Sequence, residues 1–335
     1  MTDALILAGG VAKGAFAAGV LSVLLGSEGK ASGHVDVHSI VAASSGALNG
    51  AFVASLLHAG TEEKEVDRLT SLWLEDASFG RVFEPSAAGI FKLRGASGES
   101  KALGILRRAI TPAPKVRTIE LRLVVASLEG SVEELGGAPA TTYERVFLYD
   151  AATFESAERL ETMFRTVTAS AAFPGAFVPV PLEIDGRTVD CVDGGAVNNT
   201  PLAYALLHPF EIDRVFVVSP EPRVNVPTLR DRKGLGLITH LADMLVEERL
   251  FRDLKEAYAL NETLVRLEQT VPDAALRAHV IETLGWTGRK PITIVELRPP
   301  TALPGEVFDG FFSRELRQTY VTAGANATRA WLTRA

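Results

Sequence analysis

Ser44 has the local surroundings of a serine that could act as a nucleophile. It stands in HSIVAASSGALNGAF (38–52), where an apolar run is followed by small residues and then by a helical pattern. A serine in such a strand–turn–helix segment projects its hydroxyl from the top of a sheet, usually within the pattern G-x-S-x-G. Centred on Ser44, the segment matches the second glycine at Gly46 and has Ala42 at the first. Centred on Ser45 it matches neither glycine, and the alternative for both serines is that they only cap the following helix.

Asp193 could be the carboxylate that serves this serine as a base. In TVDCVDGGAVNNTPL (188–202) an apolar strand ends at Asp193, and Gly194 and Gly195 follow. Functional side chains of α/β proteins gather at the carboxyl ends of strands, although an aspartate before two glycines is also common in simple turns. Asp190 competes with Asp193 but lies inside the strand.

The histidines do not offer a well-placed base. A serine nucleophile needs a neighbouring group that takes its proton, and histidine is the usual one. In an α/β-hydrolase triad the histidine follows the acidic residue late in the chain, and none of these histidines stands in a recognisable turn there. A carboxylate that acts directly on Ser44 is therefore the leading interpretation. The six histidines are His34, His38, His58, His208, His240 and His279.

A glycine-rich turn near the N-terminus could bind an anion. It lies in LAGGVAKGAFAAGVL (7–21), where an apolar run leads through Gly9, Gly10 and Val11 into a helical pattern. Such a turn directs backbone N–H groups at one point, which suits a phosphate or the oxyanion of an acyl-transfer intermediate. A purely structural turn is the third interpretation. The dinucleotide pattern G-x-G-x-x-G lacks its middle glycine here, and a P-loop would need Ser or Thr after the lysine.

These residues need a sheet to position them, and the apolar runs predict one. The runs are continuous rather than alternating, which is typical of strands buried on both faces of a mostly parallel sheet. Helical patterns lie between them, so we expect an α/β fold with three layers, α/β/α, and a helix-rich C-terminal part. The predicted strands are 4–7, 38–43, 121–127, 145–149, 214–219 and 292–297, and the predicted helices include 15–25, 47–58, 154–167 and 313–332.

We expect a single domain over residues 1–335, with the chemical motifs confined to 4–202. Residues 61–114 are predicted to form helices and loops that cover one end of the sheet. Residues 235–285 are helical and amphipathic; we interpret them as a helix packed on the core, or alternatively as a lid or a lipid-facing helix. The apolar stripe of this segment comprises Leu237, Leu241, Met244, Leu245 and Phe251.

Composition narrows the classes of function. The 335 residues are 47% hydrophobic and 22% charged, with a formal net charge of −7 and no basic run. This argues against nucleic acid as a partner and against strong adsorption to anionic membranes. Cys191 is the only cysteine, which excludes an intrachain disulfide and a cysteine-rich metal site. We find neither a signal peptide nor the roughly 18 apolar residues of a membrane span, so we expect a cytoplasmic protein.

Taken in order, the motifs resemble those of the patatin-like phospholipase family. TASAAFPGAFVPV (168–180) adds a match to the family's serine-rich segment before the aspartate strand. The resemblance covers residues 4–202 and implies a lipid acyl hydrolase of the phospholipase A or lysophospholipase type, which works through an acyl-enzyme and needs no cofactor and no metal. The sequence departs from the family pattern at Val11, which replaces the last glycine of a G-G-G run, and at Ala42.

Carried over by position, the resemblance implies a role for each motif residue. Ser44 would be the nucleophile and Asp193 its proton acceptor. The backbone N–H groups of Gly9, Gly10 and Val11 would form the oxyanion hole. Lys13 matches the basic position of the loop, and the supporting glycines are Gly14, Gly46, Gly194 and Gly195.

The expected partner is a lipid or another ester. If it is a lipid, we expect transient contact with a membrane surface, through apolar residues of the helix at 235–251. A general carboxylesterase for soluble esters and a non-catalytic lipid-binding member of the fold are the alternatives within the resemblance. A nucleotide-binding oxidoreductase is the alternative outside it, but that interpretation leaves both the serine turn and Asp193 unexplained.

Overall fold

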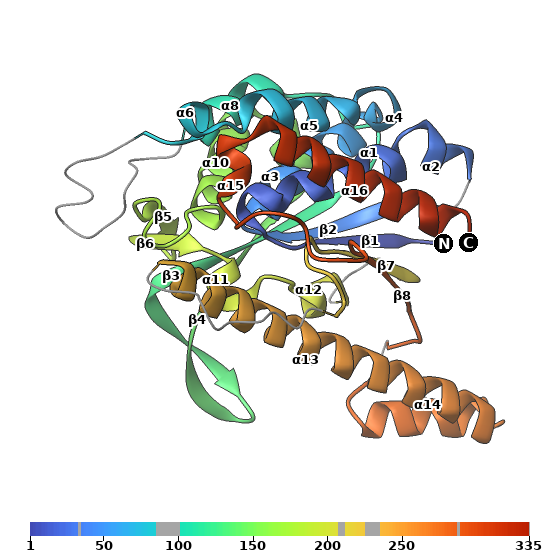
Figure 1. The fold of residues 1–335 in the computed structure, drawn as a ribbon. Helices are drawn as coiled ribbons and strands as arrows, with labels where there is room; N and C mark the ends of the chain where they lie inside the picture. Colours follow the sequence, from blue (N-terminus) through green and yellow to red (C-terminus); the bar gives the residue numbers. More distant parts are fainter. Residues whose placement is uncertain (33–34, 85–100, 207–211, 225–234, 287–288, 335) are drawn as a thin grey trace.

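A computed structural model shows one mixed sheet with helices on both faces (Figure 1). It describes residues 1–32, 35–84, 101–206, 212–224, 235–286 and 289–334, with the backbone alone at 206, 235–243 and 245–247. The eight strands follow the order β5-β6-β3-β2-β1-β7-β8, and β4 pairs with β3. Their bounds are β1 (Asp3–Leu7), β2 (Val37–Ala43), β3 (Glu120–Leu135), β4 (Ala138–Tyr149), β5 (Val180–Ile184), β6 (Arg187–Asp193), β7 (Arg214–Val218) and β8 (Thr293–Leu297).

The predicted mostly parallel sheet is confirmed. All six predicted apolar runs form strands, namely β1, β2, β3, β4, β7 and β8. The pairs β1–β2, β1–β7, β2–β3 and β7–β8 are parallel, whereas β4 and β6 run antiparallel to β3 and β5 runs antiparallel to β6. The sequence predicted the strand that ends at Asp193 but not β5 beside it.

The predicted helices are also present, with ends shifted by up to three residues. They are α1 (Ala15–Leu25), α3 (Ser45–Ala59), α10 (Ala157–Ser170) and α16 (Arg314–Leu332). Residues 61–114 form short helices where they are described, while 85–100 lie outside the described residues. The remaining described α-helices are α2 (Ser27–Ala31), α4 (Glu62–Glu65), α5 (Asp67–Ser71), α6 (Phe79–Val82), α8 (Ala102–Ala109), α9 (Ala151–Phe154), α11 (Gly195–Asn198), α12 (Leu202–Leu206), α13 (Leu235–Thr270), α14 (Ala274–Thr283) and α15 (Asp309–Phe312). A 3-10 helix spans Val11–Gly14 and a π-helix spans Leu72–Asp76.

The helices form two layers because both faces of the central strands are apolar. Leu5 and Leu7 of β1 pack in one cluster with α1, α3, α10 and α16. Ala4 and Ile6 point the opposite way and pack with residues of α12 and α13. All four side chains are fully buried, as expected when successive residues of a strand face opposite layers. The three-layer α/β/α fold predicted from the sequence is therefore confirmed.

Two strands meet end to end along β3, and this junction creates the site described below. Val124 of β3 pairs with Ala43, the last residue of β2, and Val125 pairs with Asp193, the last residue of β6. Both residues of β3 also pair with β4 on the other side. Hence β2 and β6 share one edge of β3 and run toward each other. The residues that leave β2 and β6 must therefore lie close together.

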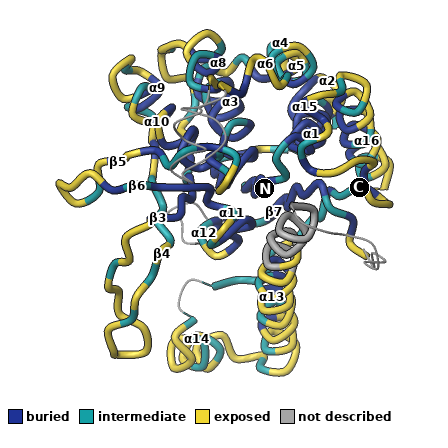
Figure 2. The backbone as a smooth tube through the Cα atoms, turned by 60° about the vertical axis from the view of Figure 1, so that its left-hand side comes forward, coloured by how far each residue is buried: buried dark blue, intermediate teal, exposed yellow. Residues whose placement is uncertain are grey.

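The β3–β4 hairpin and the α13–α14 pair project from the body (Figures 1 and 2). The sequence predicted strands only over 121–127 and 145–149, because the apolar runs end there. The structure continues both strands into a hairpin whose tip, 133–139, is exposed. Backbone pairing between β3 and β4, rather than burial, sustains this extension, and a search for apolar runs does not detect it.

Helix α13 packs on the sheet through a different stripe from the one predicted. Leu250, Leu254 and Ala257 are buried against the sheet. Met244 and Phe251 are 51% and 61% exposed, so the prediction that they share a packed stripe is wrong. The side chains of Leu237, Leu241 and Leu245 lie outside the described residues. The middle of α13 therefore packs on the core, as expected, but through the face that carries Leu250 rather than the predicted face that carries Phe251.

The sequence analysis found no membrane span, but one helical segment has the length and composition of one. Val11–Ala31 is long and apolar enough, by length and composition, to cross a membrane. However, 78% of its most apolar window is buried inside the fold, where α1 packs against α16 and α3. We therefore interpret it as a core helix.

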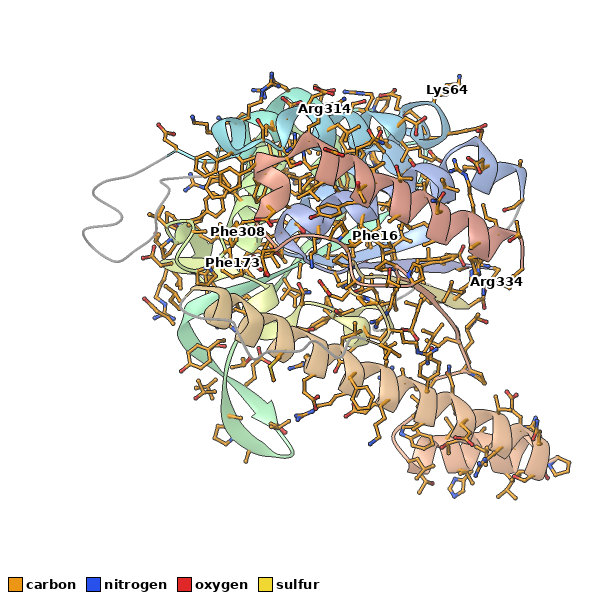
Figure 3. The ribbon with its side chains drawn as sticks, viewed as in Figure 1. Phe16, Lys64, Phe173, Phe308, Arg314 and Arg334 are labelled. Atoms are coloured by element: carbon orange, nitrogen blue, oxygen red, sulfur yellow. The ribbon has the colours of Figure 1, made fainter. Side chains whose placement is uncertain are left out.

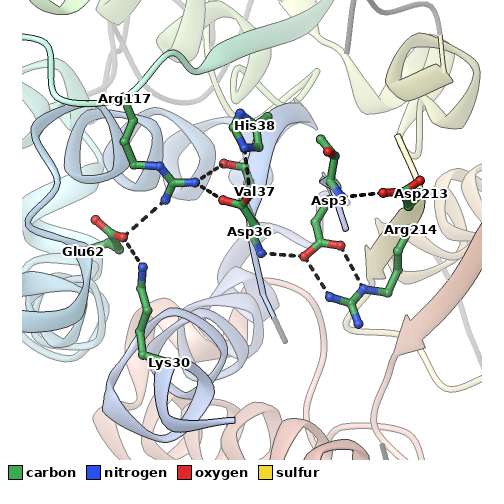
Figure 4. Close-up of polar contacts among 10 residues, drawn as sticks. Asp3, Lys30, Asp36, Val37, His38, Glu62, Arg117, Asp213 and Arg214 are labelled. Carbon is green, nitrogen blue, oxygen red and sulfur yellow. Dashed lines mark hydrogen bonds and ion pairs between the residues drawn. The ribbon is translucent and has the colours of Figure 1, made fainter. Parts of the chain in front are cut away.

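A polar network closes the end of the sheet at which β1 and β2 begin (Figure 4). Asp3 is fully buried and accepts two hydrogen bonds from the guanidinium of Arg214, at 2.9 and 2.8 Å. The backbone N–H of Asp36 donates to the same carboxylate at 2.7 Å. Arg117 then connects Asp36 to Glu62. The buried charges are thus paired, which is the condition for tolerating them in a low-dielectric interior.

Candidate active site

Ser44 occupies a strained turn between β2 and α3. Its backbone has φ 55° and ψ −133°, a conformation that is costly for a residue other than glycine and that persists where surrounding structure enforces it. Here the Ser44 N–H donates to Ser170 Oγ at 2.9 Å, and that hydroxyl donates to the Val124 carbonyl at 2.6 Å. The turn is thereby tied to β3 at the strand junction. A strand, a strained serine and a helix form the nucleophile-elbow arrangement.

The Ser44 hydroxyl donates a 2.7 Å hydrogen bond to Asp193 Oδ2. Each residue follows or ends one of the two strands that meet along β3, which explains why they are neighbours although they are 149 positions apart. The capping interpretation of Ser44 is wrong, because its side chain accepts no N–H of α3. Ser45 Oγ is buried and has no hydrogen-bond partner among the described residues. Asp190 is three residues before Asp193 in β6, so it faces the other side of the sheet.

Burial raises the pKa of Asp193 to about 7. The side chain is 3% exposed, and desolvation outweighs the hydrogen bonds from Ser44 and from the Gly195 N–H, both of which lower the pKa. The Gly195 N–H donates to Asp193 Oδ1 at 2.7 Å, so each carboxylate oxygen has a donor. A carboxylate with a pKa near neutrality, in contact with a hydroxyl, is suited to proton transfer with that hydroxyl.

The glycine-rich turn touches the serine directly at Gly9. A Cβ at Gly9 would overlap with Ser44 Cβ and with Asn199 Oδ1, so only glycine fits there. The Gly9 N–H donates to Asn199 Oδ1 at 2.9 Å. Sequence reasoning grouped this amide with the oxyanion donors, but the amide is already engaged. The role of Gly9 in this structure is the close approach of the turn to Ser44.

The next two residues carry amides that are available to an anion. Neither the Gly10 N–H nor the Val11 N–H donates to another described residue. Val11 has φ 52° and its side chain lines the pocket in front of Ser44. This is the left-handed region that favours glycine and is costly for a β-branched residue. The departure from glycine noted at this position therefore falls where positive φ is required, yet the valine adopts it.

The other motif residues support the turn and the elbow. Gly46 lies against the carbonyls of Leu7 and Ala8 with no room for a Cβ, so the sequence match at this glycine has a steric reason. Gly194 is equally crowded by the Val124 carbonyl. Lys13 is buried and forms a 3.1 Å ion pair with Glu221. Gly14 lies against Ser45, and its carbonyl accepts a hydrogen bond from Asn49 at 3.0 Å.

An apolar pocket opens in front of the pair formed by Ser44 and Asp193. Among the described residues that line it, the polar side chains are those of Ser44, Ser45 and Asp193. No described residue of 235–285 lines it, and the lid role of that segment stays a prediction. Most of the wall comes from α3, the residues around α6 and α8, and the loop before β5. The apolar lining comprises Val11, Leu48, Leu72, Trp73, Ala77, Val82, Ala102, Ile105, Ala171, Phe173, Phe177 and Phe311.

The described histidines lie away from this pocket. His38 pairs with Asp36 at 3.0 Å in the network at the opposite end of the sheet. His58 is buried against the Ala113 carbonyl, and His279 is exposed on α14. His34, His208 and the side chain of His240 lie outside the described residues. Within the described part of the chain, no group of three or more His, Cys, Asp or Glu side chains could hold a metal ion.

Two residues of the site were not singled out from the sequence. Ser170 ties Ser44 to β3, and Asn199 holds Gly9 through its side-chain oxygen. Both stand in segments that carry the motifs, 168–180 and 188–202, but nothing in their local spacing distinguishes them. Their partners lie 126 and 190 positions away in the chain, so only the folded geometry identifies their contacts.

Comparison with known proteins gives a family for this chain and solved structures that resemble it. The family model described as patatin-like phospholipase matches residues 5–206. The search of curated proteins found no match. Among solved structures, the crystal structure of VipD from Legionella pneumophila aligns with a TM-score of 0.39 and 12% sequence identity. The alignment covers 99% of this chain and 66% of the VipD chain, so the chain spans slightly less than two thirds of that protein's length.

Proposed function

This chain belongs to the patatin-like phospholipase family, and on that premise we propose that it is a serine acyl hydrolase that cleaves lipid esters. The family supports lipid acyl hydrolase activity in general. The observation that carries the more specific proposal is the 2.7 Å hydrogen bond from Ser44 Oγ to Asp193 Oδ2 in the lining of an apolar pocket. An apolar pocket with few polar groups suits an acyl chain, and the polar pair stands where the ester carbonyl would lie.

The proposed mechanism is a two-step acyl transfer. Asp193 accepts the proton of the Ser44 hydroxyl as its oxygen attacks the ester carbonyl. The amides of Gly10 and Val11 donate to the resulting oxyanion, helped by the amino end of α3. Collapse of this intermediate breaks the ester bond, and Asp193 gives its proton to the leaving alcohol. Water, deprotonated by Asp193, then adds to the acyl carbonyl, and collapse breaks the bond to Ser44 Oγ, which takes the proton back from Asp193 as the fatty acid leaves.

Fatty-acid release from a panel of lipids tests this proposal. We expect wild-type protein to release fatty acid from at least one of phosphatidylcholine, lysophosphatidylcholine and a neutral glyceride, and the Ser44→Ala variant to release none above background. Hydrolysis of p-nitrophenyl butyrate alone would instead support the carboxylesterase alternative. Ser45→Ala is the matched control, since it removes the neighbouring hydroxyl, which has no partner among the described residues.

A fluorophosphonate probe separates the enzyme from a non-catalytic lipid-binding protein. The probe bonds only to an activated serine hydroxyl. Labelling of wild type and of Ser45→Ala, but not of Ser44→Ala, is the expected pattern. Intact lipid binding without labelling and without fatty-acid release would contradict the proposed function.

Replacing Val11 by glycine should change the reaction little. The backbone at this position already has φ 52°, and the substitution keeps the N–H donor, so the oxyanion contact is preserved. We expect kcat for p-nitrophenyl butyrate to stay within about a factor of three, which corresponds to less than about 1 kcal/mol in the barrier. A rise of more than tenfold in the Val11→Gly variant would mean instead that valine holds the amide out of position.

A further inference from the structure

A series of phenylalanine rings connects the surface with the pocket. On the surface, Phe312 stacks on Phe79 with ring centroids 4.7 Å apart, and Phe79 stacks on Phe83 at the same distance. Phe83 contacts two pocket-lining rings, Phe177 at 4.6 Å and Phe311 at 5.2 Å. The rings come from three segments that are distant in the sequence, around α6, before β5 and at α15. Phe173 and Phe308, labelled in Figure 3, extend the group at the same end of the molecule.

The outer pair of rings is exposed to solvent. Phe79 is 37% and Phe312 is 68% exposed, whereas Phe83 and Phe177 are buried. Neither outer ring lines the pocket in front of Ser44. Two stacked aromatic rings on the surface, continuous with an apolar pocket, are a feature of interaction sites rather than of an ordinary solvated surface.

A basic hollow lies beside these rings. Its described lining comprises the basic side chains Arg81, Lys101 and Arg108, the acidic side chain Asp76, and two glycines, Gly80 and Gly104. The short segments that supply it also supply the pocket, because Ala77, Val82, Ala102 and Ile105 line the inner side. Asp76 pairs with Arg81 at 2.7 Å and lies 4.0 Å from Arg108, so among the described lining residues three cations face one carboxylate. The chain as a whole carries a net charge of −7, which makes this local excess of positive charge distinctive.

We infer that the Phe79–Phe312 pair and the adjoining basic hollow form the surface that docks on a lipid bilayer carrying anionic phosphate headgroups. This inference rests on the proposed function, and it names the surface through which the acyl chain would reach Ser44. The two rings insert at the interface, where amphipathic and aromatic side chains partition favourably. Arg81, Lys101 and Arg108 attract the phosphates beside them. The sequence analysis expected the helix at 235–251 to contact the membrane, and we assign that role to this surface instead.

Charge and continuity favour a bilayer over a protein partner as the occupant. Positive side chains next to exposed rings complement a layer that has phosphate outside and hydrocarbon inside. The rings also lead without interruption to the apolar wall of the pocket, so a lipid drawn from the bilayer could pass along apolar contacts. The exposed Phe251 of α13 lacks this second feature, because α13 contributes no described residue to the pocket.

Flotation with vesicles of ether-linked lipids tests the docking surface separately from catalysis. Ether-linked phosphatidylcholine cannot be hydrolysed, so binding is measured without turnover. We expect wild type to bind, and to bind more tightly when ether-linked phosphatidylserine is added. Phe79→Ser/Phe312→Ser should lower the partition coefficient by about tenfold or more, since it removes the apolar contact. Phe251→Ser, an exposed phenylalanine on α13, is the matched control and should bind as wild type does.

A second pair of variants tests the charges. The Lys101→Gln/Arg108→Gln variant should lose most of the increase in the partition coefficient that phosphatidylserine causes. Each side chain should account for about a fivefold change in that coefficient, and binding to phosphatidylcholine alone should be unchanged. Arg252→Gln/Arg266→Gln on α13 is the matched control, since these side chains are 69% and 73% exposed. All variants should hydrolyse p-nitrophenyl butyrate, a soluble ester, at the wild-type rate.

A fluorescent label reads the contact directly and does not depend on a destabilising change. The only native cysteine, Cys191, is fully buried and burial raises the pKa of its thiol to about 11, so a label will react at a new exposed cysteine. An environment-sensitive dye on the Phe312→Cys variant should shift to shorter wavelength on anionic vesicles, and the same dye on Phe251→Cys should not.

The outcomes separate docking from the proposed function. The docking surface would be overturned if the Phe79→Ser/Phe312→Ser variant bound vesicles as tightly as wild type, or if Phe251→Ser lost as much binding as that variant. It would also be overturned if the dye on Phe312→Cys showed no shift on anionic vesicles. A wild type that binds no vesicle would overturn it too, and would leave a protein partner for these rings. Loss of p-nitrophenyl butyrate hydrolysis in Ser44→Ala is independent of all these results, because that assay contains no lipid surface.

Discussion

The Asp193→Asn variant should lose hydrolysis of p-nitrophenyl butyrate by a factor on the order of 10³ or more, as should Ser44→Ala. Asparagine has the same shape as aspartate but cannot accept the proton of the Ser44 hydroxyl, which lies 2.7 Å away. No described histidine lines the pocket to replace it. Steady-state kinetics measure the loss, and Asp190→Asn, in the same strand, is the matched control. Activity of Asp193→Asn near the wild-type level would contradict the assignment of Asp193 as base.

The pH dependence should identify the same group. Asp193 acts as a base only when it is ionised, and its pKa in the folded protein is about 7. We therefore expect kcat/KM of wild type to rise with pH through an inflection near 7. The folded state binds this proton more tightly than the unfolded state, where the pKa is near 3.8. The associated stability is thus complete below about pH 4 and is lost as the pH rises to about 7.

The same linkage provides a check on the fold of the variant. The introduced asparagine would be neutral at every pH, so the Asp193→Asn variant should not show this loss of stability between about pH 4 and pH 7. Its melting temperature at about pH 8 should equal or exceed that of wild type, since the wild-type carboxylate is then charged and buried. A melting temperature well below that of wild type would mean that lost activity reflects misfolding, and Ser44→Ala would then carry the test alone.

Replacing Asp3 by alanine should lower the free energy of unfolding by about 3–5 kcal/mol, because it removes the carboxylate of a buried, doubly hydrogen-bonded ion pair with Arg214. Arg214 is 6% exposed and donates two hydrogen bonds to Asp3, at 2.9 and 2.8 Å. Urea unfolding measures the change. Under conditions in which the Asp3→Ala variant is folded, it should keep the wild-type kcat. The network lies at the end of the sheet where β1 and β2 begin, whereas Ser44 follows the opposite end of β2.

Two comparison variants make this second prediction specific. Asp213 accepts from Lys290 and from the Thr2 N–H at a half-exposed position, so Asp213→Ala should cost at most about 1 kcal/mol. Asp3→Leu/Arg214→Met removes both charges and should recover much of the loss, because a buried pair can be replaced by apolar side chains at little cost. An equal loss in Asp3→Ala and in this double variant would mean that lost packing, rather than the loss of the Asp3 charge beside Arg214, dominates.

Local pattern was sufficient for the elements and for the chemical candidates. The strands β1, β2, β7 and β8 and the helices α1, α3 and α16 appear where their apolar patterns predicted them. Burial along most of the length explains this for β1, β2, β7, α1 and α3, whereas α16 buries one face against the core. Ser44, Asp193 and the glycine-rich turn were selected from neighbours within a few positions of each. Gly9 and Gly46 are visible as glycines in the sequence, but the atoms that leave no room for a Cβ at either position come from distant segments of the chain.

Only the tertiary structure decided how these parts meet. Nothing local shows that β6 runs antiparallel to β3 and meets the end of β2, although this junction brings Ser44 and Asp193 together. The engagement of the Gly9 amide by Asn199 and the stacking of Phe79 on Phe312 likewise join segments that are 190 and 233 positions apart. Hydrophobic periodicity reports burial along one element, whereas these contacts depend on strand order and direction. The sequence by itself therefore determined the chemical groups, and the packing of distant strands and helices determined which of them act on one another.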